Sequence, residues 1–298
     1  MDSIKNLRPK WTWKSLLKTV FFWFKIVILG LLLALVLRLF VFSSFKVPTS
    51  SMEPAILAGD YILVNKLAYG ARLPKNFNFM KGGEFETFRV KGFSKIKRND
   101  VVVFNFPYPD WYGIGWDLSL YYVKRCVALP GDTFYIDKGI YKVKNCSDVL
   151  GNYEAQRRFS KVRTEEIPPE IFHCFPNNED YHWTVKLFGP LYVPRKGDTL
   201  AIDPKNIALY RNLIRYETNK EIYLKNDTVY LDNEFLQSYI FQQNYYFMAG
   251  DWVSDSKDSR YWGLLPEDHI VGKAAIIWKS KKIETDRYRW KRFFKKIK

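Results

Sequence analysis

A short serine-containing segment is the first candidate for catalytic chemistry. Residues 47–54 read Val-Pro-Thr-Ser-Ser-Met-Glu-Pro, so two serines and a threonine lie between two prolines. Proline fixes one backbone dihedral, and a segment that contains two of them forms a stiff turn. A serine held in such a turn can act as a nucleophile if the chain also supplies a base and donors for the oxyanion.

The histidines are poor candidates for that base. None of the three, at His173, His182 and His269, lies in a sequence context typical of a Ser-His-Asp triad, so we interpret them as surface or hydrogen-bonded residues. A lysine can replace the histidine, but it must be neutral to accept a proton. At the reference pKa of about 10.4 only a few lysines in ten thousand are neutral near pH 7, so a catalytic lysine has to be buried.

Lys124 fits this requirement best. Residues 121–129 read Tyr-Tyr-Val-Lys-Arg-Cys-Val-Ala-Leu, which predicts a strand. Because side chains alternate along a strand, Lys124 and Arg125 are expected on opposite faces, and one of these two cations is expected to point into the core. A lysine that is paired with an acid or lies at a sheet edge is the alternative interpretation.

A third polar cluster lies near the C-terminal end, between two predicted strands. Residues 250–263 read Gly-Asp-Trp-Val-Ser-Asp-Ser-Lys-Asp-Ser-Arg-Tyr-Trp-Gly, which is dense in hydroxyl and carboxylate groups. Asp258 and Arg260 are expected to pair and fix the loop, and Ser256 is a candidate to hydrogen-bond and orient a lysine amine. A polar surface turn is the alternative.

An apolar run precedes the serine segment. Residues 20–42 are long enough to cross a hydrocarbon core of about 30 Å as a helix, and Lys25 and Arg38 lie near the ends, where long side chains reach the headgroups. Basic residues are more frequent before this run than close behind it. The positive-inside rule therefore predicts residues 1–19 in the cytoplasm and the rest of the chain outside. A cleaved signal peptide is the alternative, although no small-x-small cleavage site follows.

The chain after this run is predicted to be mainly β. Short stretches rich in β-branched and aromatic residues alternate with turns of the Gly-Asp or Asn-Asp type, which predicts a barrel-like or sandwich core. Part of residues 203–220 is expected to be helical. The strands are expected at 62–67, 101–106, 121–129, 133–137, 141–143, 200–202, 222–224, 228–231, 245–249 and 269–278.

Differences in composition along the sequence also suggest how the chain is divided into regions. Residues 138–244 include a polar, charged stretch and are expected to form a β-rich region inserted into a core made by residues 43–137 and 245–280. Residues 281–298 form a basic C-terminal tail, which is expected to lie on anionic headgroups. A tail that is disordered in solvent is the alternative.

Composition helps to separate the possible partners. The 298 residues carry a net charge of +16, which is typical of chains that bind nucleic acid or an anionic membrane. The excess lies before residue 19 and after Trp278, and no nucleic-acid-binding motif lies between them. This distribution favours an anionic lipid surface and argues against nucleic acid.

The three cysteines do not form a metal-binding motif. No Cys-x-x-Cys pair is present, so neither zinc nor any other metal is expected. Cys146 and Cys174 could form a disulfide if the domain lies outside the cytoplasm, which the sequence leaves open. Cys126 would then remain, as a small buried apolar residue.

Taken together and in this order, these stretches resemble the conserved boxes of type I signal peptidases, membrane-anchored Ser–Lys proteases that remove signal peptides. The match covers the anchor, about residues 43–132 and about residues 245–280, which together are a little over half of the chain, and it leaves residues 138–244 without a motif. The matching boxes are residues 48–54, residues 98–104 (Arg-Asn-Asp-Val-Val-Val-Phe), residues 122–132 and residues 250–263.

The resemblance implies catalytic roles for three residues. Ser51, the serine before Met52, is the nucleophile, and Lys124 is the general base. The backbone N–H of Ser51 and the hydroxyl of Thr49 stabilise the oxyanion. Ser50 is the alternative nucleophile by residue type alone. No cofactor is implied.

The same resemblance implies supporting roles in the last box. Ser256 matches the serine that orients the lysine, and Asp258 and Arg260 match a structural pair. Two positions depart from the family pattern, because Trp252 replaces a common asparagine and Asn99 replaces a common glycine. Neither change removes a catalytic group, but both leave the geometry of their loops open.

The implied function is a serine endopeptidase that cuts N-terminal signal peptides from exported precursors, with small residues, typically alanine, at the first and third positions before the cut. The enzyme is expected in the inner (cytoplasmic) membrane, with one span, its N-terminus in the cytoplasm and its catalytic domain outside. The implied fold is a β catalytic core with a second β region inserted. Two alternatives remain: an inactive relative that binds or assembles envelope proteins, and a self-cleaving Ser–Lys regulator of DNA repair.

Overall fold

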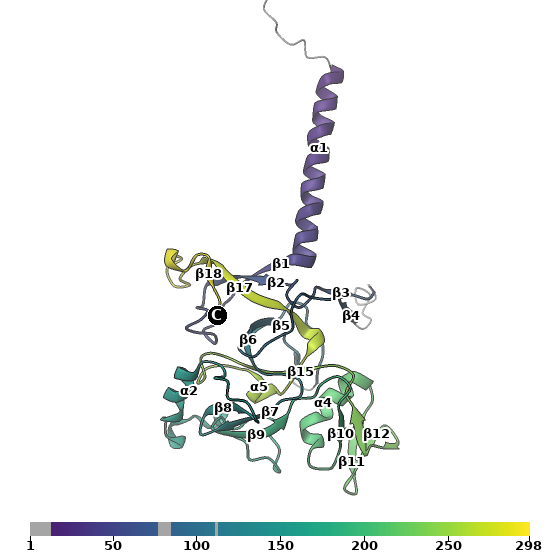
Figure 1. Cartoon of the computed structure of the whole chain (residues 1–298), viewed down its shortest axis with the longest axis vertical. Coiled ribbons are helices and arrows are strands. Elements are labelled where there is room, and N and C mark those ends of the chain that lie inside the picture. Colours follow the sequence, from purple (N-terminus) through teal and green to yellow (C-terminus); the bar gives the residue numbers. More distant parts are fainter. Residues whose placement is uncertain (1–12, 77–84, 111–112) are drawn as a thin grey trace, which may run out of the picture.

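A computed structural model describes residues 13–76, 85–110 and 113–298 of the chain, so most of the predicted cytoplasmic segment, residues 1–19, lies outside the described part. The first described element is the long helix α1 (Trp13–Val36), which continues into a π-helical turn, η1 (Leu37–Val41). This helix stands apart from the other elements, and no residue of it is buried against the described chain (Figure 1). Trp13–Val41 is long and apolar enough to cross a membrane.

A lysine joins this helix to the rest of the fold. After η1 the chain enters β1 (Phe42–Lys46), which pairs in antiparallel fashion with β2 (Asp60–Asn65). Lys66, directly after β2, donates hydrogen bonds to the backbone oxygens of Arg38 at 2.8 Å and Leu39 at 3.2 Å. The last carbonyls of a helix have no partners within the helix. Lys66 therefore supplies partners for two of them and fixes the helix end on the sheet.

The strands β1 and β2 belong to a central antiparallel sheet. Its strand order is β1-β2-β17-β5-β6-β15-β16, with β18 paired to β17, so strands from both ends of the chain are neighbours. The strands not yet located are β5 (Val101–Asn105), β6 (Tyr121–Ala128), β15 (Tyr245–Ala249), β16 (Leu265–Pro266), β17 (Ile270–Ser280) and β18 (Lys295–Lys296).

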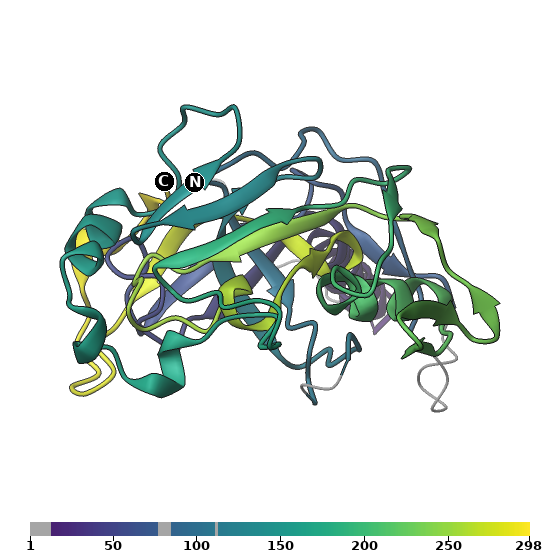
Figure 2. The same ribbon diagram turned by 90° about the horizontal axis from the view of Figure 1, so that it is seen from below.

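The other elements form smaller units, most of them on the side of the central sheet away from α1 (Figures 1 and 2). The small sheets are β8-β7-β9, β10-β14, β11-β12-β13 and β3-β4. Their strands are β3 (Arg72–Pro74), β4 (Thr87–Arg89), β7 (Thr133–Asp137), β8 (Ile140–Val143), β9 (Leu187–Tyr192), β10 (Thr199–Ala201), β11 (Ile222–Lys225), β12 (Thr228–Leu231), β13 (Glu234–Phe235) and β14 (Ser238–Ile240). The helices are α2 (Tyr153–Ser160), α3 (Pro169–Phe172), α4 (Ile207–Thr218) and α5 (Ser259–Trp262), with 3-10 turns η3 (Thr164–Glu166), η4 (Glu267–His269) and η5 (Trp290–Arg292).

Aromatic packing joins the small sheet β8-β7-β9 to the central sheet. Phe134 of β7 stacks on Phe247 of β15 with ring centroids 4.1 Å apart, and Phe188 of β9 contacts both rings. All three side chains are buried. Burial of apolar area is the main favourable term in folding. The region that follows β7 therefore shares one core with β15 rather than being joined to it by a linker.

The prediction of a mainly β fold is confirmed. The strands expected at 133–137, 228–231 and 245–249 have the predicted bounds, and the helical part of residues 203–220 is α4. The sequence did not indicate α2. Its N-terminus is capped by Asn152, whose side chain accepts a hydrogen bond from the backbone N–H of Ala155 at 3.2 Å. Asparagine is a favoured residue at this position.

The basic tail is folded onto the core. Arg292 forms an ion pair with the buried Asp60 at 2.6 Å, and Arg289 donates a hydrogen bond to the backbone oxygen of Ala58 at 2.9 Å. The short strand β18 then pairs with β17. These contacts order the segment, so the alternative of a tail disordered in solvent is wrong.

Candidate active site

The serine turn, residues 48–54, lies between β1 and β2 and is closed by backbone hydrogen bonds. The N–H of Val47 donates to the oxygen of Asp60, and the N–H of Gly59 donates to the oxygen of Val47, both at 2.8 Å. Gly59 has a φ of +89°, and a Cβ there would lie 2.0 Å from the backbone oxygen of Lys281, so only glycine fits. The side chain of Met52 is completely buried beneath the turn, which fixes the neighbouring serine.

A buried lysine contacts one of the two serines in this turn. The Nζ atom of Lys124 is hydrogen-bonded to the Oγ atom of Ser51 at a distance of 2.5 Å. Lys124 comes from β6, and its side chain is enclosed, with 4% of the residue exposed. The hydroxyl of Ser50 instead bonds the carboxylate of Asp255 at 3.4 Å. The structure therefore pairs the lysine with Ser51, which is the serine predicted to be the nucleophile.

Burial changes the acid–base behaviour of this lysine. Desolvation lowers the pKa of Lys124 to about 8, because it disfavours the charged amine; the carboxylate of Asp258 opposes this shift and the guanidinium of Arg260 adds to it. With a pKa of about 8, roughly one lysine in ten is neutral at pH 7. This fraction is about two hundred times larger than for an exposed lysine, so Lys124 can accept a proton near neutral pH.

Thr49 places a second hydroxyl next to the serine. The distance between Thr49 Oγ1 and Ser51 Oγ is 3.5 Å, at the outer limit of a hydrogen bond. Both hydroxyls and the lysine amine thus occur together at the open end of the turn.

Ser256 is also brought to the site. Its Oγ atom is buried, and in the described part of the chain it has no hydrogen-bond partner. A Cβ on Gly250 would lie 2.1 Å from this oxygen and 2.6 Å from the backbone oxygen of Ser51, which places the Ser256 hydroxyl beside the serine turn. No bond between Ser256 and Lys124 is formed here, so the orienting role of Ser256 stays a prediction.

Asp258 and Arg260 form a fully buried ion pair that shapes the loop after β15. Arg260 donates to both carboxylate oxygens of Asp258, at 2.8 and 2.9 Å. Asp258 also accepts from the N–H of Gly250 at 2.9 Å, and Arg260 donates to the oxygen of Val253 at 2.9 Å. Each charge is therefore paired, and the pair closes the loop on itself.

A second buried ion pair was not predicted from the sequence. Arg125 donates to both carboxylate oxygens of Asp251, at 2.7 and 2.6 Å, and to the backbone oxygen of Asn99 at 2.8 Å. Lys124 is buried, as expected, but Arg125 on the other face of the strand is buried as well, which was not expected. Alternation along a strand predicts the face on which a side chain lies. It does not predict that Asp251, from another part of the chain, lies on the face of Arg125 and pairs with it.

The structure accounts for Asn99, one of the two departures from the family pattern, and it places the other, Trp252, next to Ser51. Asn99 has a φ of +70°, a left-handed conformation that asparagine tolerates better than most residues, and its side chain bonds the N–H of Gly151 and the oxygen of Val149, both at 2.7 Å. The backbone N–H of Trp252 donates to the oxygen of Ser51 at 3.1 Å. Both residues therefore belong to ordered loops beside the site.

A groove leads to Ser51 and Lys124. Its volume is about 860 Å³, and it runs between the segment that follows β1 and the strand β6. Its lining residues include apolar side chains from several strands, among them Phe45, Val47, Ile62, Val103 and Val123. A peptide in extended conformation fits between two such strand segments, with alternate side chains toward the apolar lining.

The remaining candidates do not enter this site. All three cysteines carry free thiols in the structure, and Cys126 is buried as expected. His269 is buried and hydrogen-bonded through both ring nitrogens, to Asp268 at 2.8 Å and to the backbone oxygen of Gly115 at 3.0 Å. This agrees with its interpretation as a hydrogen-bonded structural residue.

Comparison with known proteins identifies the class to which this fold and site belong. The sequence profile of the family described as "Signal peptidase, peptidase S26" matches residues 20–182 and 188–279. The chain therefore belongs to the signal peptidase family, peptidase S26, and it is a membrane-anchored serine endopeptidase.

Individual relatives agree with this assignment. Signal peptidase I of Buchnera aphidicola subsp. Acyrthosiphon pisum is 31% identical over 82% of this chain and 70% of the relative. Signal peptidase I of Haemophilus influenzae is 27% identical over 88% of this chain and 71% of the relative. For Signal peptidase I of Helicobacter pylori the identity is 27%, over 90% of this chain and 89% of the relative. The resemblance found in the sequence is thus confirmed.

Proposed function

We propose that this chain is a signal peptidase I that cuts N-terminal signal peptides from exported precursors, with Ser51 as the nucleophile and Lys124 as the general base. The observation that carries the proposal is the 2.5 Å contact between Ser51 Oγ and the buried amine of Lys124. The lowered pKa of that amine supplies a neutral base. The family relationship supports the choice of substrate.

The catalytic steps follow from this arrangement. The precursor lies extended in the groove, with small side chains at the first and third positions before the cut. Neutral Lys124 takes the proton of Ser51, whose oxygen attacks the carbonyl carbon, while the Ser51 N–H and the Thr49 hydroxyl stabilise the oxyanion. Lys124 then protonates the leaving amine. In the second half of the reaction a water molecule gives a proton to Lys124 and attacks the acyl–Ser51 ester, the bond to the Ser51 oxygen breaks, the cleaved peptide leaves as a carboxylate and Lys124 returns the proton to Ser51.

The loop after β15, which lines part of the groove with Asp255 and Lys257, also supports these steps. Ser256 orients the amine of Lys124, since its buried hydroxyl lies beside the serine turn and otherwise lacks a partner in the described chain. The Asp258–Arg260 pair holds the loop that carries Ser256. In this account residues 43–137 and 245–280 form the catalytic core, and residues 138–244 are the inserted region.

The site is proposed to work at the outer face of the inner membrane. The helix end, β1 and the C-terminal tail lie at one end of the domain (Figure 1). In that tail Trp290 and Phe294 are 70% and 74% exposed, among several lysines and arginines. Aromatic and basic side chains together are typical of surfaces that bind anionic headgroups. We place residues 1–19 in the cytoplasm and the catalytic domain outside.

The test of the proposed function is cleavage of a precursor by three variants. Ser51→Ala and Lys124→Ala are expected to lose processing, because each removes one half of the dyad. Ser50→Ala is the matched control and retains processing, since the Ser50 hydroxyl does not contact the lysine. Processing is followed as the mobility shift of a purified precursor. Normal processing by Ser51→Ala or Lys124→Ala would contradict the mechanism, and a fluorogenic signal-peptide substrate left intact by the unmodified chain would favour an inactive relative.

A further inference from the structure

A second hollow next to Ser51 is not used by the mechanism above. We call it the α2 pocket, and its volume is about 370 Å³. Its walls come from the serine turn, from α2 and from the loop after β15, and they include Glu53, Pro54, Arg158, Phe159, Trp252 and Ser254.

The α2 pocket and the substrate groove are lined by consecutive parts of the same two segments. The groove uses residues 45–51 and residues 255 and 257, whereas the pocket uses residues 53–54 and 251–254. Ser51 lies where the two meet, and its backbone oxygen accepts a hydrogen bond from Trp252 at 3.1 Å. A peptide that enters through the groove and crosses Ser51 therefore continues toward the pocket. An extended chain advances about 3.3–3.6 Å per residue, so the first residues after the cut can reach it.

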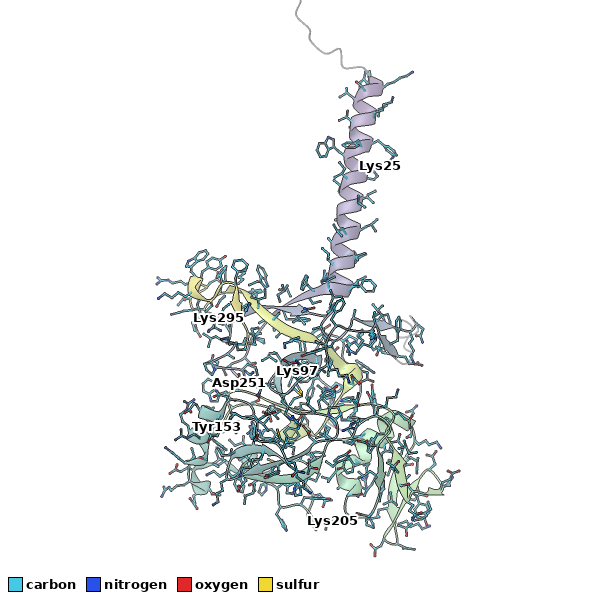
Figure 3. The ribbon with its side chains drawn as sticks, viewed as in Figure 1. Lys25, Lys97, Tyr153, Lys205, Asp251 and Lys295 are labelled. Atoms are coloured by element: carbon cyan, nitrogen blue, oxygen red, sulfur yellow. The ribbon has the colours of Figure 1, made fainter. Side chains whose placement is uncertain are left out.

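The pocket is held in shape by contacts from both sides. The side chain of Asn152, the cap of α2, donates to the backbone oxygen of Asp251 at 3.1 Å. Tyr153 of α2 and Asp251 accordingly lie on the same side of the molecule (Figure 3). Phe159 is buried at the base of α2. The helix and the loop after β15 are thus joined by this hydrogen bond.

Trp252 gives this pocket its chemical character. Trp252 is 40% exposed. Its indole N–H donates a hydrogen bond to the hydroxyl of Ser254 at 3.0 Å, which fixes the ring. Pro54 and Phe159 add apolar lining. A fixed, exposed indole next to such a lining attracts aromatic and large aliphatic side chains. The asparagine that is common at this position in the family pattern would not.

We propose that the α2 pocket binds one of the first residues of the mature chain, directly after the cleaved bond, and that Trp252 gives it a preference for an aromatic or large aliphatic side chain. The proposal rests on the proposed function, because it takes the peptide to cross Ser51 from the groove.

The experiment compares peptides that are identical up to the cleavage site and carry Phe or Ser at each of the first three positions after it. The full chain in detergent is expected to have a higher kcat/KM for the Phe peptide at one of these positions. In Trp252→Asn the ratio of the two kcat/KM values is expected to fall about threefold to tenfold. Phe235→Asn, which removes another exposed aromatic residue that lines neither the groove nor the α2 pocket, is the control and keeps the ratio.

A binding measurement separates this proposal from the proposed function. The dissociation constants of the same peptides, labelled with a fluorophore, are measured with Ser51→Ala and with Ser51→Ala/Trp252→Asn. A preference for Phe that is lost with Trp252 supports the pocket, even if the unmodified chain cleaves neither peptide. Equal losses for the Phe and Ser peptides, or no change in either, would overturn it, whether or not cleavage occurs.

Discussion

At the scale of single residues, the account depends on the hydroxyl beside the nucleophile. Thr49 Oγ1 lies 3.5 Å from Ser51 Oγ, and its proposed role is to donate to the oxyanion. Thr49→Val removes the hydroxyl and keeps the shape. Loss of one oxyanion donor costs about 10²–10³ in kcat, so a fall of this size is expected with KM little changed. Thr49→Ser, which keeps the hydroxyl, should retain most of the activity. Steady-state kinetics with a peptide substrate checks both variants, and a Thr49→Val enzyme with normal kcat would remove Thr49 from the mechanism.

Some residues of the site could be predicted from the sequence, and others could not. The local pattern of a strand made Lys124 a candidate base, whereas only the resemblance to the family favoured Ser51 over Ser50 as the nucleophile. The partner of Arg125 could not be found in this way, since Asp251 is 126 residues away and only the pairing of β6 with β15 brings them together. The hydrogen bonds of the Asn99 side chain to the loop before α2 could not be predicted either, because their partners are about 50 residues away in the sequence.

At the scale of elements, the loop after β15 depends on one buried ion pair. Asp258→Ala would leave the guanidinium of Arg260 buried without its partner, which typically costs about 3–5 kcal/mol. Lys142→Met breaks a surface pair with Asp137, in which both side chains are more than 40% exposed, and should change the free energy of unfolding far less, because water screens an exposed pair. Urea unfolding of the detergent-solubilised chain measures both free energies of unfolding. Equal values for the two variants would show that the buried pair does not hold the loop.

Elements also differ in how readily they could be predicted. The strands of β7, β12 and β15 have a clear pattern of β-branched and aromatic residues, and their predicted bounds agree with the structure. The helix α2 lies in a polar stretch with few apolar residues, so its periodicity is weak. It is held by the Asn152 cap and by the burial of Phe159, and the second of these depends on the tertiary fold.

At the scale of the whole molecule, the fold places a buried amine next to a membrane anchor. The helix end is fixed to the sheet through Lys66, and the same sheet carries β6 with Lys124. One sheet therefore connects the helix end with the strand that carries Lys124. The central claim of this account is that the arrangement keeps Lys124 neutral enough to act as a base.

The pH dependence of kcat/KM tests this claim most directly. Because the active form is the neutral amine, activity should rise about tenfold per pH unit at low pH and level off above the pKa of Lys124, which burial lowers to about 8. The measurement uses the full chain and one peptide substrate, which is designed to contain no group that titrates between pH 6 and 10. An inflection near pH 8 is the predicted result. An inflection near the ordinary lysine pKa of about 10.4, or a profile without one, would contradict the account.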